Sequence, residues 1–158
     1  GTVGVMKIHK NSANTGDEAN NTEVVYELTD FKSDEITGLT VKNTNGEFSF
    51  TKTEEGWISD DKPEDTVNES KIERMITVVR NLKSSGKISG VSDMEQYGLS
   101  DSATKVTLKT SSGDKTILIG DVNETILKAY ICIYGEKDIY TYGTSIVSEF
   151  DFSLDDLF

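Results

Sequence analysis

Alternation of hydrophobic and polar residues predicts strands in the first half of the chain. Residues 36–42 alternate in this way, and the alternation resumes over residues 48–50. A period of two places such side chains on one face of a strand. Asn45-Gly46 lies between these stretches and is a strong two-residue turn signal, because both turn positions need positive φ. We predict a hairpin here, with a strand at residues 24–28 before it and a short strand at Trp57-Ile58 after it.

The next segment has helical periodicity. Thr66 and Glu69 have the spacing of a capping box, in which each side chain satisfies a backbone N–H group of the other residue. The apolar residues that follow recur at intervals of three and four, which places them on one side of a helix. They are Ile72, Met75, Ile76, Val79 and Leu82. We predict an amphipathic helix that starts at Thr66, ends before Gly86 and buries this side in the core.

Strand patterns return in the second half of the chain. They cover residues 105–110, 116–119, 129–134 and 138–142, with a Ser112-Gly113 turn after the first of them. The whole pattern therefore predicts an α+β fold, with a mostly antiparallel sheet built from hairpins and one main amphipathic helix.

The two halves of the chain contain similar hairpin sequences. Residues 39–46 align without gaps to residues 106–113, at an offset of 113 − 46 = 67 residues. Two interpretations are open. The chain contains two hairpin-led repeats, or the similarity arose by chance, since a polar turn between alternating strands is common.

The N-terminal region has a different composition. Residues 9–22 are rich in Asn, Thr, Ser, Asp and Gly and lack a periodicity that a core could use, which is typical of a linker. We predict a flexible tether or linker over residues 1–22 and a single α+β domain over residues 23–158, a length that can bury one sizeable core. The chain begins with Gly1, and we expect the natural protein to carry an anchor ahead of it.

Charge limits the classes of partner. The chain contains 16 Lys and Arg against 28 Asp and Glu, so its formal net charge is −12 at pH 7. Nucleic acids and anionic membrane surfaces attract clustered cations. We therefore expect no nucleic-acid partner, and contact with a membrane only through an N-terminal anchor. The sequence does not predict an oligomeric state.

Few residues suggest chemistry of their own. Cys132, the only cysteine, lies in a predicted strand and is expected to be a small buried hydrophobe, whereas His9, the only histidine, lies in the predicted linker. The loop that begins at Asp121 resembles a calcium loop but has Ile126 where the sharp turn needs glycine. Asp151, Asp155 and Asp156 are expected to form a solvated face. We predict no catalytic residue, no metal and no cofactor.

The order of several short motifs resembles a known family. The motifs are Ile36-Thr37-Gly38-Leu39-Thr40-Val41, Phe50-Thr51-Lys52, Gly56-Trp57-Ile58, Tyr97-Gly98-Leu99, Val106-Thr107-Leu108, Ile119-Gly120 and Ile139-Tyr140. From about residue 24 to residue 158, this order looks like Domain of Unknown Function 4340. The resemblance implies an extracytoplasmic protein of the bacterial envelope, usually anchored by an N-terminal helix or lipid. It also implies that some relatives are associated with transporter components of gliding motility, and it implies no known active site.

Two functions from different classes are consistent with these features. The first is a non-catalytic extracytoplasmic binding or scaffolding module, tethered to the envelope, which holds a protein or glycan as an accessory to a transporter or gliding-type complex. The alternative is a carboxylate-dependent hydrolase acting on polysaccharide. The hydrolase needs two carboxyl groups about 5 to 10 Å apart in a deep cleft.

A binding module needs a surface, and the strand at residues 129–134 offers one. Successive side chains point to opposite faces, so Ile131 and Ile133 should face the core. Tyr130 and Tyr134 then share the other face, and Tyr142 on the following strand extends the row. Tyrosines combine an apolar ring with a polar tip, which suits an interface. The alternative is that the helix covers this face and the tyrosines are ordinary core residues.

Overall fold

The structure is a computed structural model that describes residues 24–158. The predicted tether over residues 1–22, with His9, lies outside the described residues. The strands are β1 (Tyr26–Glu27), β2 (Ile36–Asn43), β3 (Gly46–Thr53), β4 (Gly56–Ser59), β5 (Lys83–Ser84), β6 (Gly86–Ile88), β7 (Thr104–Thr110), β8 (Lys115–Asn123), β9 (Lys128–Ile133) and β10 (Ile139–Gly143). The helices are α3 (Glu69–Arg80) and α4 (Ser145–Glu149), and the 3₁₀ turns are η2 (Ser33–Glu35), η3 (Met94–Tyr97) and η4 (Leu154–Leu157).

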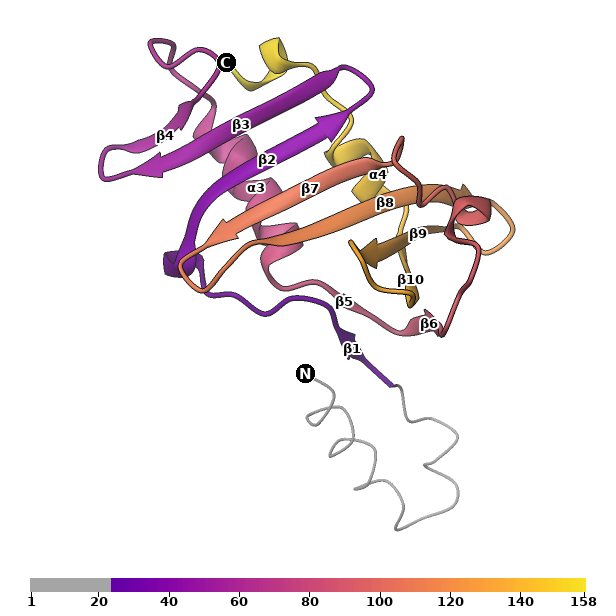
Figure 1. Cartoon of the computed structure of the whole chain (residues 1–158). Coiled ribbons are helices and arrows are strands. Elements are labelled where there is room, and N and C mark those ends of the chain that lie inside the picture. Colours follow the sequence, from indigo (N-terminus) through magenta and orange to yellow (C-terminus); the bar gives the residue numbers. More distant parts are fainter. Residues whose placement is uncertain (1–23) are drawn as a thin grey trace.

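Eight of the strands form one sheet, in the order β4-β3-β2-β7-β8-β9-β10-β6 (Figure 1). All neighbours in it are antiparallel, and β1 forms a separate antiparallel pair with β5. The fold is therefore α+β, with a mostly antiparallel sheet and one main helix, as predicted. The strand predicted at residues 24–28 is reduced to the two residues of β1, whereas β8 extends past the predicted residues 116–119.

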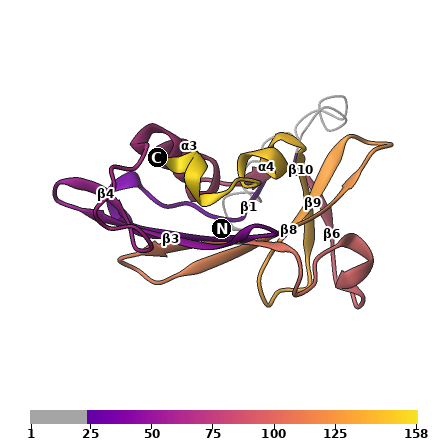
Figure 2. The same ribbon diagram turned by 90° about the horizontal axis from the view of Figure 1, so that it is seen from above.

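The helices α3 and α4 cover one face of the sheet (Figure 2). In β2 and β7, Leu39, Val41, Val106 and Leu108 face them and are 0% exposed. Four members of the predicted stripe lie in α3 and are buried in the same core, and the fifth, Leu82, is buried just after the helix ends at Arg80. Burying one such side chain contributes about 1.5–3 kcal/mol to stability. No helix among residues 24–158 has the length and apolarity needed to cross a membrane.

The start of α3 differs from the predicted capping box. The helix begins at Glu69, and its N-cap is Asn68, whose side-chain oxygen accepts the backbone N–H of Lys71 at 3.3 Å. The predicted start at Thr66 is therefore wrong. A capping box requires Glu69 to turn back toward the N-cap, but its carboxylate accepts the backbone N–H of Trp57 at 3.2 Å. A tertiary contact with β4 thus replaces the local one.

The hairpin of β2 and β3 is confirmed, but its turn lies one residue earlier than predicted. Thr44 and Asn45 form the loop, and Asn43 pairs with Gly46. Of the residues in this turn, only Gly46 has positive φ, at +140°. The prediction of positive φ at both Asn45 and Gly46 is therefore wrong. The Asn43 side-chain oxygen accepts the backbone N–H of Asn45 at 2.7 Å and thereby stabilises this turn. The turn at 110–113 has the same form, with Gly at its last position.

The two similar hairpins pair with each other through equivalent residues. Thr40 lies opposite Thr107, which is its equivalent 67 residues further along the chain. Leu39 likewise lies opposite Leu108, the equivalent of Val41. An antiparallel pair in which equivalent residues exchange places has a local twofold axis, which here passes between Thr40 and Thr107. Chance similarity does not require this register, so the structure favours the repeat interpretation.

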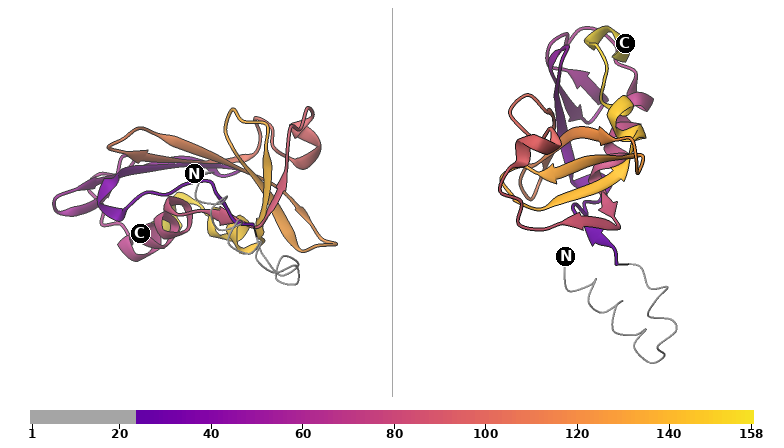
Figure 3. Two further views of the ribbon diagram at one scale, coloured as in Figure 1. Left: turned by 90° about the horizontal axis from the view of Figure 1, so that it is seen from below. Right: turned by 90° about the vertical axis from the view of Figure 1, so that its right-hand side faces the viewer.

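A second, smaller cluster lies on the side of the sheet opposite α3, where the chain around η3 covers β9 and β10 (Figure 3). Its buried members are Val91, Leu99, Ala103, Leu118, Cys132 and Ile139. No periodic pattern predicts this covering, because residues 89–103 contain only isolated apolar positions. At this end the sheet is buried on both faces, whereas polar side chains of β3, β2 and β7 on the same side remain exposed or half-buried.

Asn43→Thr tests how the C-terminal segment is held to the sheet. The Asn43 amide nitrogen donates to the backbone oxygens of Phe150 and Phe152, each at 2.9 Å. Threonine retains an acceptor for the turn but removes both donors, so we expect a loss of about 2 kcal/mol in the free energy of unfolding. Thr53→Asn makes the reverse change in the exposed turn after β3 and should cost less than about 0.5 kcal/mol. If urea unfolding shows equal losses of free energy in the two variants, the proposed role of Asn43 in holding the C-terminal segment is contradicted.

Candidate functional site

Four hydroxyl side chains form a row across the sheet. Ser49, Thr40, Thr107 and Thr116 come from β3, β2, β7 and β8, and each lies directly opposite the next. Hydrogen bonds of 2.9 Å join Thr40 to Ser49 and Thr107 to Thr116. Since neighbouring strands lie about 4.8 Å apart, the row spans roughly 14 Å. We call these residues the hydroxyl row, and the side of β3, β2, β7 and β8 that carries them, facing away from α3, the open face (Figure 1).

The hydroxyl row ends beside an aromatic side chain. The backbone N–H of Tyr134 donates to the carbonyl of Thr116 at 2.9 Å, which places Tyr134 next to the last member of the row. Tyr134 is 57% exposed. The Lys105 ammonium lies 5.0 Å from the centroid of its ring. A cation over an exposed aromatic ring contributes about 0.5–1 kcal/mol, so this contact orients both groups at the margin of the open face.

Three lysines flank the hydroxyl row. Lys42 and Lys105 are direct cross-strand neighbours on one side of it, and Lys109 lies on the other side. Side chains in such direct pairs have Cβ atoms about 5 Å apart, and like charges there are destabilising. Glu47, opposite Lys42 on β3, is the neighbouring acidic residue. None of the three lysines takes part in an ion pair within the described part of the chain. A second acidic side chain, that of Asp60, accepts the Thr51 hydroxyl at 2.8 Å at the β4 end of the same face.

Tyr130, the first of the three tyrosines predicted to bind a partner, packs in the second cluster. Its ring centroid lies 4.9 Å from that of Tyr97, in an edge-to-face arrangement. Its hydroxyl accepts a hydrogen bond from the Asn123 side-chain nitrogen at 2.8 Å. The predicted core orientation of Ile131 and Ile133 is confirmed. The chain around η3, and not the helix, covers the tyrosine face at this point.

The strand register separates the predicted tyrosines. Thr141 lies opposite Tyr130, whereas Tyr142 lies opposite Ala129 and packs against the main core on the α3 side. Tyr134 alone remains exposed on the open face. The structure therefore does not bring Tyr130, Tyr134 and Tyr142 into one row. The prediction placed Tyr142 on the wrong face because a shift of one residue in pairing exchanges the two faces of a strand.

Sequence reasoning missed the hydroxyl row and its lysines. A signal was present in the repeat, because Thr40 and Thr107 occupy equivalent positions, as do Ser49 and Thr116. Both hydrogen bonds of the row join residues nine positions apart. The alternation of polar residues within one strand does not show how they align across four strands, because that alignment depends on the register of the sheet.

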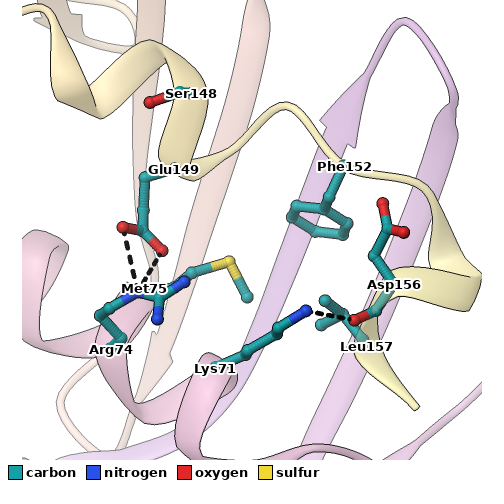
Figure 4. Close-up of a pocket in the computed structure, with 8 residues that line it drawn as sticks. All are labelled: Lys71, Arg74, Met75, Ser148, Glu149, Phe152, Asp156 and Leu157. Atoms are coloured by element: carbon teal, nitrogen blue, oxygen red, sulfur yellow. Dashed lines mark hydrogen bonds and ion pairs between the residues drawn. The ribbon is translucent and has the colours of Figure 1, made fainter.

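A groove of about 290 Å³ lies between α3 and the C-terminal segment (Figure 4). The Arg74 Nε group donates to both carboxylate oxygens of Glu149, at 3.0 and 3.2 Å. The Lys71 ammonium donates to the backbone oxygen of Asp156 at 2.9 Å. These polar groups bind one another across the groove. The contacts across the groove therefore hold the C-terminal segment against α3.

Two acidic residues, Glu149 and Asp156, line the same groove. Glu149 is held by Arg74, and the Asp156 carboxylate accepts the backbone N–H of Ser153 at 2.9 Å. The two carboxylates point away from each other (Figure 4). Among residues 24–158, no group of three or more His, Cys, Asp and Glu side chains is arranged to hold a metal. We therefore take the open face as the candidate site.

Cys132 behaves as the small buried hydrophobe that its strand position predicts. It is 1% exposed, in the second cluster. Desolvation by burial raises the pKa of its thiol from 9.0 to about 11, and the negative charge of Glu136 adds to the effect. Since the thiolate is the nucleophilic form, the structure disfavours reactivity at this position.

Comparison with known families identifies a matching family. The sequence model of the family described as "Domain of unknown function (DUF4340)" matches residues 65–158, which is more than half of the chain. The match extends from the connector before α3 to the C-terminus and includes β7, β8 and β9. No curated protein and no solved structure matches the chain.

Truncation of two tyrosines should separate packing from surface roles. Tyr130→Ala removes a ring that packs on Tyr97, and we expect a loss of about 2 kcal/mol in the free energy of unfolding. Tyr134→Ala removes an exposed ring that contacts Lys105, and the expected loss is below about 0.5 kcal/mol. Urea unfolding followed by circular dichroism measures both values. Similar losses in the two variants would contradict the assigned positions.

The Cys132 thiol should be unreactive in the folded protein. At alkaline pH it should lower the stability of the protein. The folded-state pKa of about 11 lies above the ordinary value of 9.0, so the unfolded chain releases the thiol proton first. The stabilisation is complete below pH 9 and is lost as the pH rises through 11. Relative to Cys132→Ala, the wild type should lose free energy of unfolding over this interval. If the free energies of unfolding of the two proteins differ by the same amount across this pH interval, the pKa shift is contradicted.

Proposed function

The chain belongs to the family described as Domain of unknown function (DUF4340), and from this premise we propose that it is a non-catalytic binding or scaffolding module of the bacterial cell envelope. It acts outside the cytoplasm, held by an anchor that precedes the chain. There it holds a protein or glycan as an accessory to a transporter or gliding-type complex. The resemblance described above is the basis for this location.

The open face is the surface that we assign to binding, and the lysine pair is the observation that carries the assignment. An antiparallel sheet with one face in water is common and does not by itself indicate a binding site. Here, however, Lys42 and Lys105 are opposed without a compensating ion pair in the described chain. Local interactions across strands disfavour such a pair. Its presence beside the hydroxyl row supports recognition of a ligand from outside the chain.

The shape of this surface supports binding rather than catalysis. Enzyme sites usually enclose their substrates in clefts, where water is excluded and charges act strongly. The hydroxyl row lies instead on a sheet surface, and hydrogen bonds between its members fix the side chains in place. Fixed side chains lose little conformational entropy when a ligand binds. A preorganised open surface therefore suits a ligand that is held and not transformed.

The position of β1 is compatible with a tether. β1 pairs with β5 at the rim of the molecule and does not lie over the open face (Figures 1 and 3). The Lys87 ammonium lies 5.2 Å from the Tyr26 ring centroid and fastens β1 to the domain. An anchor attached through this end would leave the open face accessible to a partner.

Thr107→Glu tests the open face as the binding surface. The larger, charged side chain disrupts the centre of the hydroxyl row, and we expect at least about a tenfold reduction in the amount of chain that sediments with envelope fragments of its source bacterium. Ser70→Glu is the matched control, because it makes the same change of charge at an exposed position in the first turn of α3. Both variants should retain the circular dichroism spectrum of the wild type. Sedimentation that is equal for Thr107→Glu and the wild type would contradict the proposal.

A further inference from the structure

The charges of the open face lie on both sides of the hydroxyl row. Lys42 and Lys109 are equivalent residues of the repeat, 67 positions apart, so the local twofold axis relates one to the other. Lys105 stands next to Lys42 and gives that side a second cation. A linear ligand that lies along the row therefore meets positive charge on its two flanks. An anionic group on this side of the row would be attracted by both cations.

The hydroxyl row has unused capacity for hydrogen bonds. A hydroxyl group supplies one donor and two acceptor lone pairs. The bond between Thr40 and Ser49 uses one donor and one acceptor of the pair, and the bond between Thr107 and Thr116 does the same. Each pair thus retains a donor and acceptors for a ligand, and all four side chains are partly accessible. A ligand that both donates and accepts hydrogen bonds along its length matches this surface.

A peptide strand does not match it well. Peptides add to a sheet at its edges, where backbone groups are free, but β2 and β7 lie in the interior of the sheet and pair on both sides. Recognition on the open face must therefore come from side chains alone.

A polysaccharide matches all three features of the face. Its hydroxyl groups both donate and accept hydrogen bonds, and its rings are suited to pack on an exposed aromatic side chain such as Tyr134. Uronate units add carboxylates, which pair with lysine ammonium groups. We propose that the open face binds an extended, carboxylate-bearing polysaccharide that lies along the hydroxyl row. This inference rests on the proposed function, because it identifies the ligand class of the same surface.

The test measures binding of the full chain to immobilised polygalacturonate, alginate and neutral dextran. We expect binding to one or both of the uronate polymers, weakened by salt, and no binding to dextran. The triple variant Lys42→Gln, Lys105→Gln, Lys109→Gln should reduce the affinity at least about tenfold. The control triple variant Lys32→Gln, Lys52→Gln, Lys128→Gln makes the same change of net charge at exposed lysines outside the open face. It should bind as the wild type does.

The remaining outcomes would contradict either the polysaccharide inference or the proposed function. Failure to bind both uronate polymers, or equal losses in the two triple variants, overturns the polysaccharide inference. Poly-L-glutamate that binds as tightly as the uronate polymers overturns it as well, because the ligand would then be an acidic polypeptide. The proposed function is judged separately by sedimentation with envelope fragments. If that sedimentation depends on Thr107 while the uronate polymers fail to bind, the binding surface stands and the ligand class is wrong.

Discussion

The pairing of β2 with β7 is the contact on which the rest of the structure depends. It joins the two hairpins into one sheet and sets the register in which Thr40 lies opposite Thr107. That register places Leu39 and Leu108 on the α3 side and the two threonines on the other side. A slip of one residue would exchange the faces, so that leucines entered water and hydroxyls entered the core. One register therefore determines both the main core and the open face.

The helix side is completed by contacts between segments that are distant in the sequence. Trp57 links β4 to α3, since its indole nitrogen donates to Glu73 at 2.7 Å. Asn43 links the turn after β2 to the C-terminal segment, which covers the sheet beside α3. The family match begins at residue 65 and thus excludes β2. The matched segment alone would leave β7 with an unpaired edge, so the first hairpin is required to complete the sheet.

The sequence predicted those features that depend on local periodicity. The strands of both hairpins, the stripe of α3 and the burial of Cys132 all follow from patterns within a few residues, and the structure agrees with them. Features set by tertiary contacts were not predictable in this way. The Glu69 carboxylate binds the backbone of β4 and does not form the expected capping box. The register of β10 with β9 places Tyr142 on the α3 side. The hydroxyl row also required knowledge of register, because its four members are polar residues of separate strands.

The lysines of the open face do not follow the local twofold symmetry of the repeat. The repeat equates Lys105 with Gly38, where a Cβ atom would lie 3.2 Å from the Phe50 carbonyl oxygen and 3.3 Å from a side-chain carbon of Lys109. A side chain is therefore disfavoured at Gly38, and only one side of the row has two lysines. A fully symmetric surface would bind a linear polymer equally well in both directions. A polysaccharide chain has two different ends, and the pair of lysines, of which Lys105 contacts Tyr134, allows the open face to distinguish them.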